Sequence, residues 1–426
     1  MSELIVTPGR ICGELNAQGS KNSVLPLLAA SLVTDDEVII RGCPRLADVD
    51  SAAAILEHLG RRVVRQDDSL VISGTLSCNH IPENLMRRMR SSVVFLGAIL
   101  TRTGRAKMTY PGGCELGPRP IDIHLEAFRS LGAVIHDESD YLECFTNGLR
   151  GVYLRLRFPS VGATENAMIA ATLADGQTII DNAAREPEIA DLARFLRTLG
   201  ADVHGENSSS ILVRGVKRCH GGTYRVAADR IAAGTYLCAA AITGGKISVK
   251  GVQTSELATL CNALGRAGCE INTESDRIRL YAPEKLRAIP QIVTEPYPGF
   301  PTDLQAPLMA ALTKSEGETQ FDERIFLNRY RHVPDLIKMG ADIRINGAQA
   351  IVHGVPILHG AAVRACELRG GAALVVAALA ADSPSCISGM EHIERGYENI
   401  DSVLRSLGIS AYLHESSDSP VHVERR

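Results

Sequence analysis

The chain repeats one pattern of about 70 residues six times along its length. Each copy contains an almost wholly apolar run, a short strand, an amphipathic helix that ends at a glycine, and a further strand. The closing glycines lie 68 or 72 residues apart and are Gly60, Gly132, Gly200, Gly268, Gly340 and Gly408. Because most solenoid repeats are only roughly 20–50 residues long, each copy is expected to fold as a small α/β subdomain.

The apolar run of each copy predicts a buried helix. Runs such as SVLPLLAASL, ENAMIAATLA and GAALVVAALAA have no polar face, and a helix that is apolar all round must be buried on all sides. The second helix, as in IADLARFLRTLG, alternates apolar and charged faces and is expected nearer the surface. Segments such as EVIIRG and KISVKG are rich in the β-branched residues that favour strands. The sequence therefore predicts a helical interior wrapped by sheets.

Six subdomains most simply form two domains of three copies each. The 426 residues allow about two to four domains at roughly 100–200 residues per domain. Two segments look equivalent, GRICGELNAQGSKNSVLPLLAA from Gly9 and HGGTYRVAADRIAAGTYLCAA from His220, and they mark the places where the chain crosses between the halves. We place these crossings near Gly19 and Ala228.

These crossings define the expected domains. The first contains residues 20–227 and includes a catalytic loop at residues 110–122. The second contains residues 1–19 together with residues 228–426, so the first strand-like segment belongs with the last three copies. The active site is expected in the cleft between the two domains.

Composition argues against several classes of function. The formal net charge is −4 and basic residues are interspersed with acidic ones, so a surface for nucleic acid or for an anionic membrane is not expected. Trp is absent and aromatic residues make up 4% of the chain, which disfavours stacking on single-stranded nucleic acid. The longest apolar stretch, Ala372 to Ala381, is shorter than the ~18–20 residues of a membrane span.

Cysteine usage and the N-terminal segment favour a cytoplasmic protein. The eleven cysteines are odd in number and form no CxxC motif, as is typical of reduced thiols. The first residues, MSELIVTPGR, lack the layout of a secretory signal. The twelve histidines are scattered without metal-ligand spacing, so a metal site is not expected.

Polar or charged residues stand where the six buried helices are expected to begin. They occupy corresponding positions in the copies and are Lys21 and Asn22, Arg90, Glu165 and Asn166, Thr235, Asp303, and Arg369. Free backbone N–H groups and the helix dipole make such ends favourable for anions, and three of the six add a cation. If the two domains face one another through these ends, they form a cleft for a polyanionic ligand.

A second concentration of unusual residues is the loop from Tyr110 to Asp122. It contains three glycines and three prolines, a composition that indicates an exposed, hinged excursion able to act as a lid. Cys114 lies beside glycines and five positions before Arg119, which makes it a candidate acid or nucleophile. The alternative for any single cysteine is an inert small hydrophobe.

Seven distinctive motifs are spread over the chain. They are GSKN at Gly19–Asn22, the PGGC loop with Arg119 and Pro120, SVGATEN at Ser160–Asn166, NAAREPEI at Asn182–Ile189, FPTD at Phe300–Asp303, NRYRHV at Asn328–Val333 and ERGYENI at Glu394–Ile400. These motifs resemble those of the UDP-N-acetylglucosamine 1-carboxyvinyltransferases, a family of enolpyruvyl transferases. The resemblance covers essentially the whole chain and implies an α/β fold, a two-domain inside-out α/β barrel built from six repeated subdomains.

The resemblance implies a reaction and its substrates. The enolpyruvyl group of phosphoenolpyruvate is transferred to the 3-hydroxyl of UDP-N-acetylglucosamine and phosphate is released, as the first committed step of peptidoglycan precursor synthesis. The reaction requires neither a metal nor an organic cofactor. The expected partners are therefore these two small molecules, with no nucleic acid and no membrane, and the sequence indicates no particular regulatory protein.

The resemblance also implies roles for individual residues. Cys114 protonates C3 of phosphoenolpyruvate, Asp303 accepts the proton of the sugar hydroxyl, and Lys21 and Arg395 complete the catalytic set. Glu186 and Glu188 support the residues that contact substrate. Phosphoenolpyruvate is bound by Lys21, Asn22, Arg90, Arg119, Arg329, Arg369 and Arg395. UDP-N-acetylglucosamine is bound by Asn22, Arg90, Arg119, Pro120, Ile121, Asp122, Ser160, Val161, Gly162, Asp303 and Ile325.

Three alternatives remain open at this point. Asp303 precedes an expected helix, where aspartate is a common cap, and it can serve as both cap and base. The related transfer onto shikimate 3-phosphate uses the same fold, although Cys114 and the SVGATEN and NAAREPEI segments favour the nucleotide-sugar. A non-catalytic paralogue that binds UDP-sugar and regulates wall synthesis is the third alternative.

Overall fold

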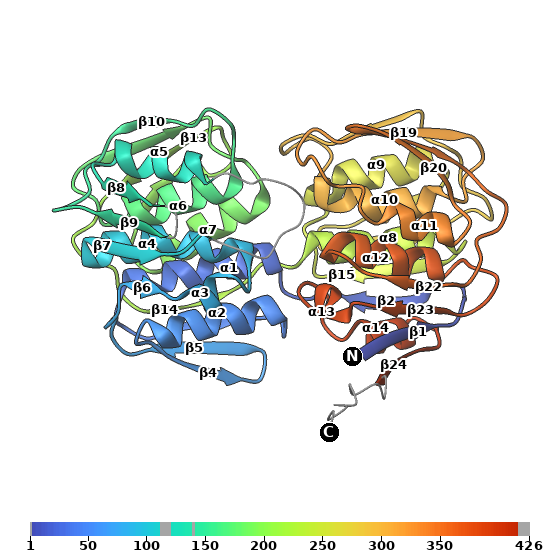
Figure 1. Ribbon diagram of the computed structural model, residues 1–426, viewed down its shortest axis with the longest axis horizontal. Coiled ribbons are helices and arrows are strands. Elements are labelled where there is room, and N and C mark those ends of the chain that lie inside the picture. Colours follow the sequence, from blue (N-terminus) through green and yellow to red (C-terminus); the bar gives the residue numbers. More distant parts are fainter. Residues whose placement is uncertain (1, 111–120, 139–140, 416–426) are drawn as a thin grey trace, which may run out of the picture. The chain divides into compact units, whose positions relative to one another are not determined.

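The computed structural model of the protein describes residues 2–110, 121–138 and 141–415. These residues contain six four-stranded sheets, which confirms the six subdomains that the repeat predicts. They fall into two compact units (Figure 1). One unit comprises Gln18–Asp229 and Glu295–Gly299, and the other comprises Met1–Ala17, Arg230–Thr294 and Phe300–Arg426.

This division differs slightly from the expected domain bounds. Each crossing lies two residues away from the predicted position, and Glu295–Gly299 groups with the first unit. The backbone N–H of Tyr297 donates to Glu186 Oε1 at 3.2 Å, which ties this short segment to the rest of that unit. Gly19 and Ala228 form an antiparallel bridge at the place where the chain is predicted to cross.

All six sheets share one plan, in which an outer strand runs parallel to the second strand and the remaining pairs are antiparallel. In the unit of Gln18–Asp229 the sheets are, in strand order, β14 (Gly222–Arg225), β3 (Val38–Arg41), β5 (Ser69–Ser73), β4 (Arg62–Gln66); β6 (His80–Ile81), β7 (Arg105–Met108), β9 (Leu142–Phe145), β8 (Val134–Asp137); and β10 (Tyr153–Arg155), β11 (Gln177–Asp181), β13 (Ser210–Arg214), β12 (Asp202–His204).

The sheets of the other unit follow the same order of pairings. They are β2 (Cys12–Asn16), β15 (Lys246–Lys250), β17 (Arg277–Tyr281), β16 (Glu270–Thr273); β18 (Gln291–Val293), β19 (Glu318–Asp322), β21 (Gln349–His353), β20 (Asp342–Asn346); and β22 (Ala362–Arg364), β23 (Ser385–Ser388), β1 (Ser2–Val6), β24 (Ala411–Glu415). The N-terminal strands β1 and β2 thus complete sheets of the sixth and fourth copies.

The helices of each unit are of the two predicted kinds. The apolar ones are α1 (Lys21–Ala30), α4 (Phe95–Thr103), α6 (Val161–Ala171), α8 (Arg230–Ile242), α10 (Gln305–Leu312) and α12 (Leu368–Ala378). The amphipathic ones are α2 (Ala47–His58), α5 (Asp122–Ser130), α7 (Pro187–Thr198), α9 (Ala258–Arg266), α11 (Val333–Lys338) and α14 (Ile400–Ser406). Shorter turns are η1 (Ser31–Val33), α3 (Glu83–Met86), η2 (Arg90–Val94), η3 (Thr254–Leu257), η4 (Thr302–Leu304) and α13 (Met390–Ile393).

The apolar helices form the core of each unit. All residues of α8, α10 and α12 are buried, and these three helices contact one another. In the unit of Gln18–Asp229, α4 contacts both α1 and α6. Figure 1 shows these helices inside each unit and the strands toward its outside. The predicted helical interior wrapped by sheet is therefore present in both units.

The six closing glycines end their helices in the way that the sequence suggests. Each has a positive φ between 87° and 103°, a conformation that favours glycine because it has no Cβ. At Gly132 the N–H bonds to the carbonyl of Arg129 at 3.0 Å, and the next N–H, of Ala133, bonds to Phe128 at 2.9 Å. This pair of bonds satisfies the last free carbonyls of α5.

A pair of glycine substitutions tests this role of the backbone. Gly132→Ala should lower the free energy of unfolding by about 1–2 kcal/mol, since alanine is strained at positive φ. An added Cβ at Gly132 has no atom within 4 Å among the described residues, so packing does not contribute. Gly265 serves as the control, because it lies inside α9 and an added Cβ there also meets no atom within 4 Å among the described residues. Gly265→Ala should raise the free energy of unfolding by about 0.5–1 kcal/mol, since alanine favours the helix over glycine. Urea denaturation measures both values, and equal stability of Gly132→Ala and the parent would contradict the assignment.

Candidate active site

The predicted site residues that the structure describes form two groups, one in each unit. Lys21, Asn22, Arg90, Ile121, Asp122, Ser160, Val161 and Gly162 belong to the unit of Gln18–Asp229, and Asp303, Ile325, Arg329, Arg369 and Arg395 belong to the other. Cys114, Arg119 and Pro120 lie outside the described residues. Each group is therefore described by itself.

Asp303 binds two arginines in the second unit. It lies in η4, directly before α10. Arg329 Nη2 donates to Asp303 Oδ1 at 2.7 Å, and Arg369 Nη2 donates to Asp303 Oδ2 at 3.0 Å. The fold thus brings the aspartate together with two arginines that lie 26 and 66 positions away from it in the sequence.

Burial differs sharply within this cluster. The side chains of Arg329 and Arg369 are each 2% exposed, whereas that of Asp303 is 26% exposed. Buried cations require charged or polar partners, and Arg329 also donates to the carbonyl of Thr302 at 3.1 Å and lies 3.8 Å from Glu367. Both carboxylate oxygens of Asp303 thus accept a hydrogen bond from a nearly buried guanidinium group, and the two bonds fix the orientation of the carboxylate.

Glu367 supports the arginines and was not found from the sequence. It precedes α12, and its Oε2 accepts from the N–H of Arg369 at 2.8 Å, while its Oε1 accepts from Gly370. The sequence feature that could have indicated Glu367 is an acidic residue directly before an apolar helix. It was not recognised as a cap because Ser, Thr, Asp and Asn are the usual capping residues. On the other side, Arg369 Nη1 lies 3.5 Å from Tyr397 Oη, which bonds Thr235 Oγ1 at 2.8 Å.

Ile325 and Arg395 belong to the same unit as Asp303. Ile325 is half-buried, and its N–H donates to Glu323 Oε1 at 2.9 Å. Arg395 is half-buried in the turn that follows α13.

Lys21 and Asn22 begin α1 in the first unit, as predicted. Ser20 caps the helix by accepting from the N–H of Ser23 at 3.2 Å. Lys21 Nζ pairs with Asp48 Oδ2 at 3.1 Å, and its backbone N–H donates to Asp229 Oδ2 at 3.2 Å. The Lys21 side chain is 13% exposed and that of Asp48 is 2% exposed, so the lysine is held at the helix end by a buried acid.

The second part of this group lies where α5 and α6 begin. Ser160 caps α6, and Val161 and Gly162 are its first residues. Asp122 begins α5 and pairs with Arg157, which the sequence reasoning did not identify. Ile121 is buried directly before Asp122.

His124 is a further residue that was not identified from the sequence. Asn166 Oδ1 accepts from the N–H of Gly97 at 2.9 Å, so its amide nitrogen faces His124 Nδ1 at 2.8 Å. Nδ1 is then an acceptor and the proton of the neutral ring resides on Nε2. A Cβ built on Gly162 would lie 3.3 Å from His124 Nε2. Burial, and secondarily the positive charge of Arg90, lowers the pKa of His124 to about 3.

Three residues predicted at helix starts lie inside helices instead. Glu165 and Asn166 are in the middle of α6, and Thr235 is in the middle of α8. The prediction was wrong because small residues before each apolar run already belong to the helix. Burial, together with the charges of Glu188 and Glu186, raises the pKa of Glu165 well above its ordinary value.

Comparison with known proteins gives the family. The model of EPSP synthase (3-phosphoshikimate 1-carboxyvinyltransferase) matches residues 5–404. UDP-N-acetylglucosamine 1-carboxyvinyltransferase 2 of Caldanaerobacter subterraneus subsp. tengcongensis is 45% identical over 400 residues, which cover 94% of this chain and 96% of that protein. The chain belongs to the enolpyruvyl transferase family. UDP-N-acetylglucosamine 1-carboxyvinyltransferase of Finegoldia magna is 43% identical, with 95% and 97% covered, so the resemblance read from the motifs is confirmed.

Solved structures of enolpyruvyl transferases share the fold. The enolpyruvyl transferase NikO from Streptomyces tendae superposes with a TM-score of 0.87 at 21% identity, covering 97% of this chain and 98% of that chain. EPSP synthase from Acinetobacter baumannii gives a TM-score of 0.74 at 17% identity, covering 97% and 100%. The predicted enolpyruvyl transferase-like α/β fold is therefore confirmed.

Proposed function

We propose that this enolpyruvyl transferase transfers the enolpyruvyl group of phosphoenolpyruvate to the 3-hydroxyl of UDP-N-acetylglucosamine and releases phosphate. The observation that carries the proposal is the 45% identity, over 94% of the chain, to a UDP-N-acetylglucosamine 1-carboxyvinyltransferase. The reaction is the first committed step of peptidoglycan precursor synthesis, and so of cell wall biogenesis, cell shape and cell division.

Asp303 is proposed as the proton acceptor. Deprotonation of a sugar hydroxyl requires a carboxylate within hydrogen-bond reach, and Asp303 is the most exposed member of its cluster with Arg329 and Arg369. The buried arginines bind both of its carboxylate oxygens. Cys114, which lies outside the described residues, is proposed to protonate C3 of phosphoenolpyruvate.

The anionic groups of phosphoenolpyruvate are proposed to bind the set of cations predicted above, three of which also contact acids of the protein. Arg329 and Arg369 already contact Asp303, and Lys21 contacts Asp48. A guanidinium has five N–H donors, so one arginine can bind an internal carboxylate and a substrate oxygen together. The remaining residues proposed for phosphoenolpyruvate are Asn22, Arg90, Arg119 and Arg395.

The nucleotide-sugar is proposed to bind where α5 and α6 begin. Val161 and Gly162 are the first residues of α6, so their N–H groups have no partner within the helix and suit an anionic group. Arg90 adds a positive charge close enough to His124 to affect its pKa. The other residues proposed for UDP-N-acetylglucosamine are Asn22, Arg119, Pro120, Ile121, Asp122, Ser160, Asp303 and Ile325.

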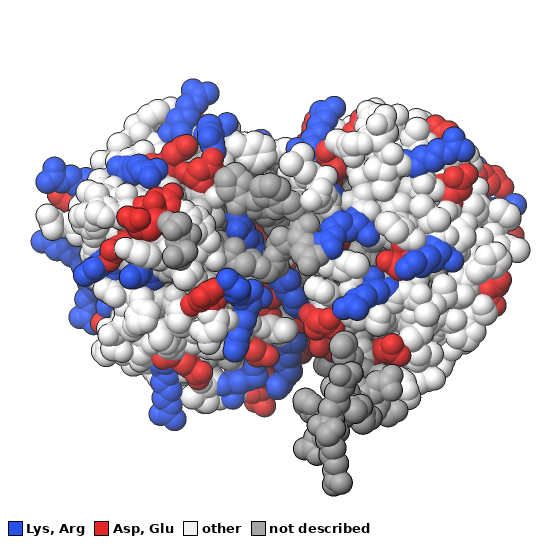
Figure 2. Space-filling view, in the orientation of Figure 1, with Lys and Arg blue, Asp and Glu red and all other residues white. Residues whose placement is uncertain are grey.

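Location and partners are proposed from the same family assignment. No helix in the described part of the chain is long and apolar enough to cross a membrane. On the face drawn in Figure 2, Lys and Arg are interspersed with Asp and Glu in each unit, which does not favour a nucleic-acid partner. We propose a cytoplasmic enzyme whose partners are its two small-molecule substrates and which needs no organic cofactor.

Phosphate release with phosphoenolpyruvate tests the proposed function. We expect release with UDP-N-acetylglucosamine as acceptor and none with shikimate 3-phosphate. Cys114→Ser should slow release by about 10²–10⁴-fold, the usual contribution of a general acid, whereas Cys12→Ser, at an exposed cysteine of β2, should not.

Each other outcome has a distinct meaning. Release only with shikimate 3-phosphate would assign the chain to the reaction named by the matching family model. Binding of nucleotide-sugar without release from either acceptor would identify a non-catalytic paralogue. Unchanged release by Cys114→Ser would remove that cysteine from the mechanism but leave the overall reaction standing.

A further inference from the structure

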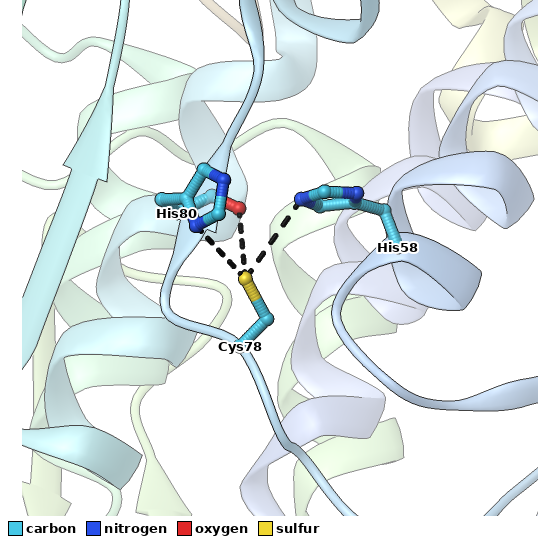
Figure 3. A group of neighbouring side chains, drawn as sticks. All are labelled: His58, Cys78 and His80. Carbon is cyan, nitrogen blue, oxygen red and sulfur yellow. Dashed lines mark hydrogen bonds between the residues drawn. The ribbon is translucent and has the colours of Figure 1, made fainter.

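Two histidines and a cysteine meet on the surface of the first unit, apart from the residues proposed for catalysis. His58 is the last residue of α2, Cys78 lies in the segment between β5 and β6, and His80 begins β6. Cys78 Sγ lies 3.0 Å from His80 Nδ1 and 3.8 Å from His58 Nε2 (Figure 3). One donor atom from each residue lies within 4.8 Å of the others.

These distances are close to those of a tetrahedral zinc site. Zinc bonds of about 2.3 Å to sulfur and about 2.0–2.1 Å to nitrogen put neighbouring donors roughly 3.3–3.6 Å apart. The two sulfur–nitrogen distances lie on either side of that range. The rings of His58 and His80 have centroids 5.1 Å apart and are nearly perpendicular, so both nitrogens approach the thiol without the rings stacking.

The backbone around the cluster is well fixed. The N–H groups of Ser77 and Cys78 both bond to the carbonyl of Leu59, at 2.9 and 3.3 Å, which places the cysteine beside the end of α2. β6 pairs with β7 at His80↔Lys107, which fixes the second histidine. Both histidines are exposed and Cys78 is half-buried, so the imidazoles can rotate toward a common ion and an ion can reach them.

We propose that His58 Nε2, Cys78 Sγ and His80 Nδ1 bind one Zn²⁺ ion, with water as the fourth ligand. Thiolate and imidazole are the donors that zinc takes in proteins. On binding, the Cys78 thiol releases its proton to solvent, and each imidazole binds through a nitrogen that carries no proton. The ion would join the end of α2 in the first copy to the segment before β6 and to β6 of the second, and so stabilise the junction between two consecutive subdomains.

The sequence did not reveal this site. The expectation of scattered histidines did not consider this cluster, because only Cys78-x-His80 is close in sequence and the hairpin of β4 and β5 separates both residues from His58. A separation of 20 residues conceals the contact between His58 and Cys78.

Zinc titration of tag-free protein tests the proposal. Cys114→Ser is the parent of this series and all further variants carry it, so that the proposed active-site thiol does not bind the metal. We expect this parent to bind one equivalent of Zn²⁺ by calorimetry and by metal analysis after gel filtration. Cys78→Ser and His80→Gln should each weaken this affinity at least tenfold, while Cys12→Ser, at an exposed cysteine in the other unit, should leave it unchanged.

Cobalt provides a second measurement that is independent of stability. Co²⁺ added to the parent should give a thiolate-to-metal charge-transfer band and the intense visible bands of a four-coordinate ion, and Cys78→Ser should lose the charge-transfer band.

Thermal unfolding provides a third measurement. Zn²⁺ should raise the melting temperature of the parent but not of Cys78→Ser, because a ligand that binds only the folded state stabilises it. Equal zinc affinity of parent and Cys78→Ser, or a cobalt spectrum without the charge-transfer band, would overturn the proposal.

Discussion

Asp303→Ala should reduce kcat by about 10²–10⁴-fold, the range expected for loss of a general base. The affinity for UDP-N-acetylglucosamine should change by less than about tenfold, because one hydrogen bond to a substrate contributes roughly 0.5–1.5 kcal/mol. Single-turnover phosphate release and calorimetric titration of the nucleotide-sugar measure the two quantities. A large effect on KM with unchanged kcat would make Asp303 a binding residue and not a base.

The control for this experiment must separate chemistry from folding. Removing Asp303 leaves two nearly buried arginines without that carboxylate, so the folded fraction of the variant has to be measured by circular dichroism. Asp303→Asn keeps the size of the side chain and removes its ability to accept a proton, and should lose kcat to a similar extent. Asp401→Ala breaks another aspartate–arginine pair of the same unit, at 2.8 Å from Arg405, and should leave kcat unchanged.

Acidification from pH 6.5 toward pH 4 should destabilise the protein through two buried histidines, one in each unit. Burial is the main reason why the pKa of His332 is lowered to about 4 and that of His124 to about 3. Both rings are neutral in the folded state, whereas the unfolded chain binds protons below about pH 6.5. The stabilisation is therefore complete above pH 6.5 and is lost as the pH falls, by on the order of 3 kcal/mol per histidine at pH 4.

Substitution isolates the contribution of His332. Neither ring nitrogen has a hydrogen-bond partner among the described residues, although the charges of Glu367, Arg329 and Asp335 act on the ring. The free energy of unfolding of His332→Gln should fall less steeply between pH 7 and pH 4.5 than that of the parent. His414→Gln, at an exposed position of β24, is the control and should show the same dependence of unfolding free energy on pH as the parent. The same pH dependence in His332→Gln would show that the buried ring is not responsible.

The sequence predicted the features that depend on local chemistry. The six closing glycines were found because a residue with positive φ at a helix end is usually glycine, and all six have a positive φ. The buried helices were found because their runs lack a polar face. The starts of α6 and α8 were missed because small residues such as Gly162 and Ala163 carry little signal for either helix or loop.

The candidate site depended on information that one sequence does not contain. Asp303 and Arg369 were noted at the expected starts of buried helices and Arg329 by the resemblance alone, but no local pattern shows that these residues, 26 and 66 positions apart, are in contact. His124 was missed because its role follows from a tertiary contact with Asn166, and Glu367 was missed because it caps α12 although glutamate is not among the usual caps. The contact of His58 with Cys78 likewise becomes visible only when α2 and the segment before β6 lie side by side.

The position of β1 affects the order in which the chain folds during synthesis. β1 lies between β23 and β24, and Leu4 pairs with Ile387. β1 therefore leaves the ribosome long before its partner strands β23 and β24, while nearly all residues of the other unit, Gln18–Asp229, emerge as one continuous stretch. Domains generally fold as units as they are synthesised. The unit of Gln18–Asp229 can therefore fold while β1 is still an unpaired strand that is able to pair with other chains.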